Sequence, residues 1–190
     1  GGYHGGYDAL SVSVKPSLEE AGPEGYPVPA TPFEVEAGTV HVTPYNDLPR
    51  LEHLLDAYAD DVAAVVMEPV LENLGIVLPD EGYLASVRAL CDQHGVLLIF
   101  DEVKTGLTAG SQGAAQRFKV NPDLICLAKS IGGGIPLAAF GGKRKFMQAV
   151  TTGSMPHFGT FNGNPLAMAG VRAMERLATD EALGQAEAFN

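Results

Sequence analysis

The stretch that decides the fold is VLLIFD, residues 96–101. Five apolar residues run into one aspartate, which is typical of a buried strand that ends on a polar residue. The same pattern recurs in VAAVVME at residues 62–68 and in LICLAK at residues 124–129. A fourth candidate strand is LAAF, residues 137–140. These short runs predict the strands of one sheet.

Amphipathic stretches alternate with the apolar runs. We expect four helices, over residues 47–58, 80–95 and 112–118 and in a segment that begins at Asn164 and Pro165. Pro49 lies in the first turn of the first helix. Asp80 is the expected cap of the second helix, and Gly95 its end. A further strand is predicted over residues 8–14, and residues 16–44, which hold six of the 13 prolines, predict an irregular loop. Strands that alternate with helices predict an α/β domain, a mostly parallel sheet with helices on both faces.

Composition excludes several classes of protein. The 190 residues are 46% hydrophobic and 18% charged, which excludes global disorder. The net charge is −11, so we expect neither nucleic acid nor a membrane surface as a partner. Cys91 and Cys126 lie in apolar contexts without metal or disulfide spacing, which favours reduced thiols and a cytoplasmic protein.

Several known catalytic and nucleotide-binding motifs are absent from the sequence, which excludes the protein classes that depend on them. It contains no GxxxxGK[ST] phosphate loop, no GxGxxG dinucleotide fingerprint, and neither HExxH nor GxSxG. The histidines show no spacing of metal ligands, and we expect no metal site.

Three polar residues follow the predicted strands: Glu68, Asp101 and Lys129. In parallel sheets, ligands bind beyond the carboxyl ends of the strands. A lysine in an apolar setting can react with an aldehyde, and an aspartate at a strand end can pair with a protonated pyridine nitrogen. These two groups suit pyridoxal phosphate, although the same two residues could form a structural ion pair.

At these residues the sequence resembles a known family. FDEVKTG at residues 100–106, PDL at 122–124 and LAKSIGGGIP at 127–136 resemble the signature of class III (ω-type) pyridoxal-phosphate aminotransferases. YHG at residues 3–5, MEPV at 67–70 and GTFNGNP at 159–165 agree, and the last is most similar to the branch containing glutamate-1-semialdehyde aminomutase. The resemblance implies a fold-type-I large domain with pyridoxal 5'-phosphate as cofactor. It also implies transfer of an amino group, through a lysine aldimine, between an amine or amino acid and an oxo acid or aldehyde.

The resemblance also implies a role for each matching residue. Lys129 would carry the aldimine and move the proton, and Asp101 would bind the pyridinium nitrogen. The other implied cofactor contacts are Val103 on one face of the ring, Tyr3 on the other with His4 beside it, Glu68 and Asn73 near the phenolic oxygen, and Thr160 at the phosphate of the neighbouring subunit. The last of these implies a homodimer with active sites at its interface.

Departures from the family pattern bear on the reaction. The family's phosphate cradle lies upstream of the Tyr-His segment and its small domain lies downstream, so we expect residues 1–190 to be an incomplete large domain. Pro156, Glu72 and residues 15–33 differ from the aminomutase pattern and favour an aminotransferase. Two alternatives stay open: 2,1-aminomutation of glutamate-1-semialdehyde, and a catalytically incompetent fragment that serves only in assembly.

Overall fold

A computed structural model describes residues 1–14, 40–58 and 60–188. The chain forms two compact units, Gly1–Val96 and Leu97–Asn190. Most of the loop predicted over residues 16–44 lies outside the described residues, and residues 40–44 form no helix or strand. Within the part of the chain that the structure describes, no helix is both long and apolar enough to cross a membrane.

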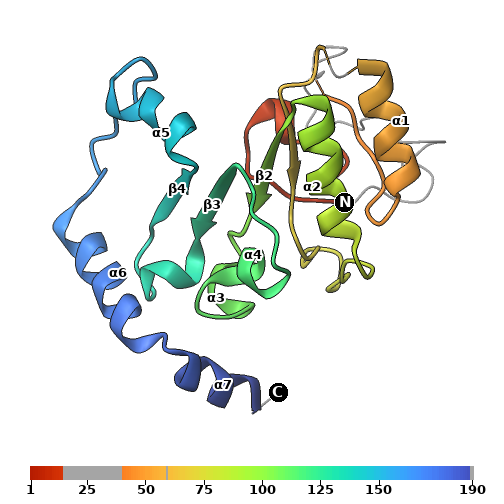
Figure 1. The fold of residues 1–190 in the computed structure, drawn as a ribbon. Coiled ribbons are helices and arrows are strands. Elements are labelled where there is room, and N and C mark those ends of the chain that lie inside the picture. The colour runs from red at the N-terminus through yellow and green to blue at the C-terminus, as the bar shows by residue number, and fades with distance from the viewer. Residues whose placement is uncertain (15–39, 59, 189–190) are drawn as a thin grey trace. The chain divides into compact units, whose positions relative to one another are not determined.

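The first unit contains two helices that pack side by side (Figure 1). Its elements are the 3-10 helix η1 (Asp8–Leu10), α1 (Leu48–Tyr58), β1 (Ala64–Met67) and α2 (Tyr83–His94). α1 begins where Asp47 Oδ1 accepts a hydrogen bond from the Arg50 N–H (3.0 Å), and α2 ends at Gly95, which has a positive φ of 68°. The helices predicted over residues 47–58 and 80–95, and the strand within 62–68, are thereby confirmed.

Two local expectations in this unit are wrong. Residues 8–14 form η1, an isolated β-bridge at Val12 and a bend instead of a strand, because the N–H groups of Leu10 and Ser11 and the Ser11 hydroxyl all bond to the Tyr7 carbonyl. Asp80 does not cap α2 through its side chain. Its carbonyl oxygen accepts from the Tyr83 N–H (3.0 Å), and Gly82, with a positive φ of 76°, turns the chain into the helix.

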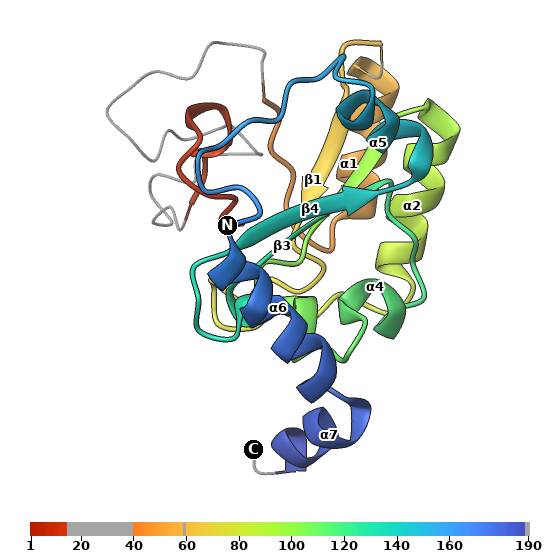
Figure 2. The same cartoon turned by 90° about the vertical axis from the view of Figure 1, so that its left-hand side faces the viewer.

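The second unit is built on strands β2 (Leu97–Asp101), β3 (Leu124–Ala128) and β4 (Ala138–Gly142), which lie side by side in that order (Figures 1 and 2). β2 and β3 are parallel, with Asp101 opposite Cys126. The short helices α3 (Thr105–Thr108) and α4 (Gly113–Arg117) lie in the connection between them. Both strands and the helix within residues 112–118 are confirmed.

β4 runs antiparallel to β3, which the apolar pattern of residues 137–140 did not indicate. The connection between them, residues 129–137, holds only the 3-10 helix η2 (Lys129–Gly132) and a glycine turn. A parallel return needs a crossover of a dozen or more residues, so this short connection reverses the chain.

Three helices follow β4 (Figure 2): α5 (Arg144–Thr151), α6 (Pro165–Leu177) and α7 (Asp180–Ala188). α6 is the helix expected to begin at Asn164 and Pro165. The Asn164 side chain accepts a hydrogen bond from the Ala167 N–H (2.9 Å), and Pro165 occupies the first turn, where its missing N–H is not needed. α6 packs against η2.

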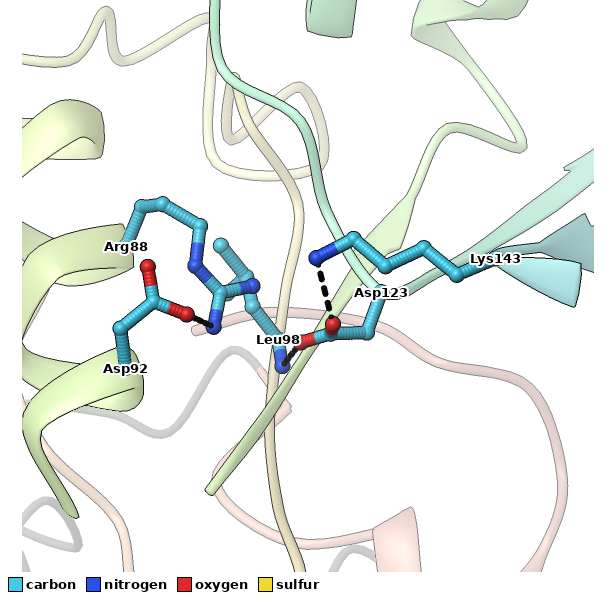
Figure 3. Close-up of polar contacts among 5 residues, drawn as sticks. All are labelled: Arg88, Asp92, Leu98, Asp123 and Lys143. Carbon is cyan, nitrogen blue, oxygen red and sulfur yellow. Dashed lines mark hydrogen bonds and ion pairs between the residues drawn. The ribbon is translucent and has the colours of Figure 1, made fainter. Parts of the chain in front are cut away.

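A buried aspartate joins the amino-terminal ends of β2 and β3 to the chain after β4 (Figure 3). Asp123 Oδ2 accepts from the Leu98 N–H (2.9 Å), and Oδ1 accepts from Lys143 Nζ (2.7 Å). The Asp123 backbone exchanges further hydrogen bonds with Leu98 and Lys143. One residue therefore fixes three segments at this end of the sheet.

We predict that Asp123→Asn lowers the free energy of unfolding by about 1–3 kcal/mol, because it removes the negative charge that pairs with Lys143 and sets an amide N–H against one of the two buried donors. Asp92→Asn is the matched control. Asp92 also pairs with a cation at 2.7 Å, that of Arg88, but its side chain is 64% exposed whereas that of Asp123 is 5% exposed (Figure 3). The control should lower the free energy by no more than about 0.5 kcal/mol. Urea unfolding measures both, and equal losses would contradict the assignment of Asp123 as a clamp.

Candidate active site

The carboxyl ends of β2 and β3 bring Asp101 and Lys129 to the same edge of the second unit. Asp101 is the last residue of β2, and its backbone lies opposite Cys126. Lys129 directly follows β3, three residues beyond Cys126. The Asp101 side chain is buried, and its Oδ1 accepts a hydrogen bond from the Val103 N–H (3.0 Å). Because the two strands are parallel, the carboxylate and the amine leave the sheet at one end.

Lys129 differs in one respect from the sequence expectation. The apolar run before it predicted an apolar setting, but the lysine is exposed. Both β4, which pairs with β3, and the turn beyond Lys129 are themselves largely exposed, so little apolar surface surrounds the amine in the described part of this unit.

The backbone of Lys129 is also unusual, with a φ of +51°. This left-handed conformation is unfavourable for a residue with a Cβ, and such outliers cluster at functional sites. No sequence pattern predicted this left-handed backbone, although the glycines that follow the lysine indicated a sharp turn.

The glycine triplet after Lys129 serves the turn and the packing of α6. Gly133 has a φ of +60°, and a Cβ there would meet the Met174 side chain at 3.0 Å. On α6, a Cβ at Gly170 would come within 2.6 Å of the Gly132 carbonyl oxygen. The helix can thus approach the lysine turn closely only because both sides lack side chains.

Glu68 forms hydrogen bonds with two of the predicted site residues of the first unit. It directly follows β1, it is buried, and its Oε1 accepts from the Tyr3 N–H (2.9 Å) and from Asn73 Nδ2 (3.2 Å). Its Oε2 accepts from the Glu72 N–H (3.2 Å). The carboxylate therefore holds the Tyr-His segment beside the loop that carries Asn73.

A cavity of about 850 Å³ lies in the same unit. His4 and Glu68 both line it, together with β1 and residues 40–45. Tyr3, by contrast, has an exposed side chain. The first unit thus brings Tyr3, His4, Glu68 and Asn73 into one neighbourhood.

Tyr45 fixes the turn after Glu68, a role that sequence reasoning missed. Its hydroxyl donates to the Pro69 carbonyl oxygen (2.6 Å), and its ring packs edge-on against Tyr83. Burial, with smaller contributions from neighbouring Tyr83, Glu68 and Asp80, raises the pKa of Tyr45, which therefore remains a neutral donor. Asn46 joins the same segment to residues 78–80, because its side chain donates to the Leu78 carbonyl and accepts from the Asp80 N–H.

Thr160 lies on the exposed loop between α5 and α6. Phe158 and Phe161 on this loop are 92% and 80% exposed. His157 stacks edge-on against Phe140 of β4 and lies within hydrogen-bond distance of Asn162. The described part of this loop therefore holds two large apolar side chains in solvent.

The chemistry of these donors fits pyridoxal phosphate. A buried carboxylate suits a protonated ring nitrogen, and an exposed primary amine at the neighbouring strand end suits an aldehyde. Val103, half-buried two residues beyond Asp101, has an apolar side chain that suits a ring. This donor set is typical of one class of proteins, the α/β enzymes that hold a pyridoxal cofactor with a lysine and an aspartate at strand ends.

Comparison with known proteins identifies the family within this class. The family model for class-III aminotransferases matches residues 1–189, and the chain belongs to this family. It is 44% identical over 182 residues to a glutamate-1-semialdehyde 2,1-aminomutase of Syntrophobacter fumaroxidans, covering 95% of this chain and 41% of that protein.

Solved structures agree with the family and confirm the fold-type-I class. An ω-transaminase from Sphaerobacter thermophilus superposes with a TM-score of 0.83 at 36% identity, over 94% of this chain and 42% of that one. A transaminase with pyridoxal phosphate bound gives a TM-score of 0.84 at 31% identity, over 95% and 42%. The chain therefore spans less than half the length of these relatives. Pyridoxal phosphate is the cofactor of the family, as the sequence indicated.

We predict that the reactivity of Cys126 reports on Asp101. Burial, and to a smaller extent the Asp101 charge, raises the pKa of the Cys126 thiol, so less thiolate exists at pH 8 than for a free cysteine. Asp101→Asn removes the negative charge, lowers this pKa and should speed alkylation by iodoacetamide about twofold to fivefold at pH 8. Mass spectrometry of the peptide containing residue 126 measures the rate. Asp180→Asn, which removes a carboxylate that does not contribute to the shift, should leave the rate unchanged, and equal rates in both variants would contradict the prediction.

Proposed function

We propose that this chain forms part of a pyridoxal-phosphate-dependent aminotransferase. The reaction moves an amino group between an amine or amino acid and an oxo acid or aldehyde. The observation that carries the proposal is the placement of Asp101 and Lys129 at the carboxyl ends of two paired parallel strands, within a chain of the class-III family.

Lys129 and Asp101 take the two central roles. When bound, pyridoxal phosphate supplies an electron sink that lets the Cα–H bond of an amino substrate break. Lys129 Nζ would hold the cofactor at its aldehyde carbon and, as a free amine, would carry a proton from the substrate Cα to that carbon. The Asp101 carboxylate holds a proton on the ring nitrogen, which keeps the ring electron-withdrawing. The exposure of Lys129 leaves its amine accessible to both cofactor and substrate.

The remaining residues orient the ring. By the resemblance to the family, Val103 would pack on one face and Tyr3 on the other, with His4 beside it. Glu68 and Asn73 act at the edge that carries the phenolic oxygen. The hydrogen bonds of Glu68 to the Tyr3 N–H and to Asn73 support this part of the proposal, because one carboxylate fixes both groups.

A second candidate function is 2,1-aminomutation of glutamate-1-semialdehyde. The names of the curated relatives favour it, since proteins 41–45% identical to this chain carry that name. Pro156 and Glu72, which depart from the aminomutase pattern, favour the aminotransferase. The two reactions differ in one requirement: a mutase turns over a single substrate without an added amino acceptor.

The proposal extends to assembly and location. Residues 1–190 are the central part of a cofactor-binding large domain in a cytoplasmic homodimer, and Thr160 reaches the cofactor phosphate of the neighbouring subunit. The exposed loop that carries Thr160, with Phe158 and Phe161 beside it, supports a role in contact with a second copy. Small-molecule amino donors and acceptors are the substrates.

We predict that borohydride reduction after incubation with pyridoxal phosphate fixes a phosphopyridoxyl group on Lys129, with loss of the visible absorption band. Lys129→Ala should abolish both the band and the adduct. Lys104→Ala, which removes a lysine just beyond the other strand end, should retain them. Peptide mapping by mass spectrometry locates the adduct. A protein with its full complement of domains that stayed colourless would refute the catalytic role and leave the structural fragment.

The dimer proposal predicts complementation between two inactive or weakened variants. Thr160→Val should weaken cofactor binding about tenfold, because one hydrogen bond to a charged phosphate is lost. Mixed dimers of Thr160→Val and Lys129→Ala subunits contain one site with both groups intact. The mixture should therefore be more active than the mean of the two parents. Activity equal to that mean would show that Thr160 does not act across the dimer.

A further inference from the structure

Glu102, the residue directly after Asp101, has no role in the chemistry described so far. Its side chain is 0% exposed, which makes it the most deeply buried carboxylate among the described residues. Acidic side chains are almost never fully buried unless every oxygen is satisfied.

Each contact of the Glu102 carboxylate is with a hydrogen-bond donor. Oε2 accepts from the Ala114 N–H (2.5 Å) and from the Thr105 hydroxyl (3.1 Å), and Oε1 accepts from the Ala115 N–H (2.9 Å). The side chain therefore ties the beginning of α4 and the first residue of α3 to the end of β2.

The backbone of Glu102 makes two more connections. Its N–H donates to the Cys126 carbonyl oxygen (2.9 Å), which carries the pairing with β3 one residue beyond Asp101. Its carbonyl oxygen accepts from the Gly106 N–H (2.9 Å). Four segments thus meet at this residue: β2, β3, α3 and α4.

Gly113 shows how closely the chain approaches the carboxylate. Its φ is +69°, and a Cβ at this position would overlap Glu102 Oε2. Only glycine satisfies both conditions. The position of the carboxylate is therefore set from several directions, as is expected of a group that fixes its neighbours.

Those neighbours are the ring-binding residues themselves. Asp101 precedes Glu102, Val103 follows it, and the Asp101 carboxylate accepts from the Val103 N–H (3.0 Å). Because side chains alternate along an extended chain, anchoring Glu102 fixes the direction in which Asp101 leaves the strand.

We propose that Glu102 is a positioning residue that holds the Asp101 carboxylate in place to keep a proton on the cofactor's ring nitrogen. This role rests on the proposed function. It needs no contact between Glu102 and the cofactor, since the effect passes through residues 101–103.

The test is Glu102→Gln in the full chain. Glutamine keeps the size of the side chain but turns one acceptor into a donor, which faces N–H or O–H groups and breaks at least one buried hydrogen bond. Asp123→Asn is the matched control, because Asp123 is a buried carboxylate at the other end of the same two strands. Thermal unfolding of both variants measures their overall loss of stability.

The first readout needs no cofactor. Hydrogen exchange at the Val103 amide, which is bonded to Asp101 Oδ1, should be about tenfold faster in Glu102→Gln than in the parent. Asp123→Asn should leave this amide unchanged and should speed exchange at Leu98 instead. An unchanged Val103 amide in Glu102→Gln overturns the proposal.

The second readout is the pH titration of the visible band of the cofactor-loaded protein. Glu102→Gln should shift the midpoint by about half a pH unit or more and should weaken cofactor binding about tenfold. Asp123→Asn should leave the midpoint in place. Equal shifts in both variants would mean that Glu102 contributes only stability, and the positioning role would be wrong.

Two further cases separate failure of this proposal from failure to fold and from failure of the proposed function. If Glu102→Gln does not fold, Thr105→Val removes one donor from the same carboxylate with little change of shape, and should move both readouts in the same direction by a smaller amount. If the parent protein shows no visible band, the proposed function fails, and exchange at Val103 alone decides whether Glu102 orients Asp101.

Discussion

The parallel pairing of β2 and β3 is the constraint on which the candidate site depends. With Asp101 opposite Cys126, the end of β2 and the turn after β3 lie at the same end of the sheet. The Asp123 carboxylate supports this pairing where the strands begin, and the Glu102 N–H extends it where they finish by donating to the Cys126 carbonyl. A slip of one residue would send the Asp101 side chain to the opposite face. The register of two short strands therefore decides whether a carboxylate and an amine can serve one ligand.

Much of this arrangement could be predicted from the sequence, because its signals are local. Apolar runs that end in Glu68, Asp101 or Lys129 gave the strands and the edge at which polar groups collect. Leucine spacing and Gly95 gave the first two helices, and the motifs around Asp101 and Lys129 indicated the family that the comparisons confirm. The roles of individual site residues remain predictions, because they depend on groups outside the chain.

What the sequence could not reveal depends on contacts between distant residues. The apolar pattern of LAAF does not give the direction of β4, which follows from its pairing with β3 across a short connection. In the sequence Glu102 is only one residue of the motif FDEVKTG, and only the fold brings Ala114 and Ala115 to its carboxylate. The strand expected over residues 8–14 failed for a different reason, because Leu10 and Ser11 bond locally to the Tyr7 carbonyl.

The left-handed backbone of Lys129 lowers the stability of the fold, whereas its amine serves the proposed reaction. A non-glycine residue in this conformation costs about 1–2 kcal/mol, and the positions that follow show that glycine was an available solution in this turn. Glycine at position 129 would remove this conformational cost and stabilise the fold, but glycine has no side-chain amine. A search for stabilising substitutions would therefore select against the residue on which the proposed activity depends, a trade-off typical of active sites.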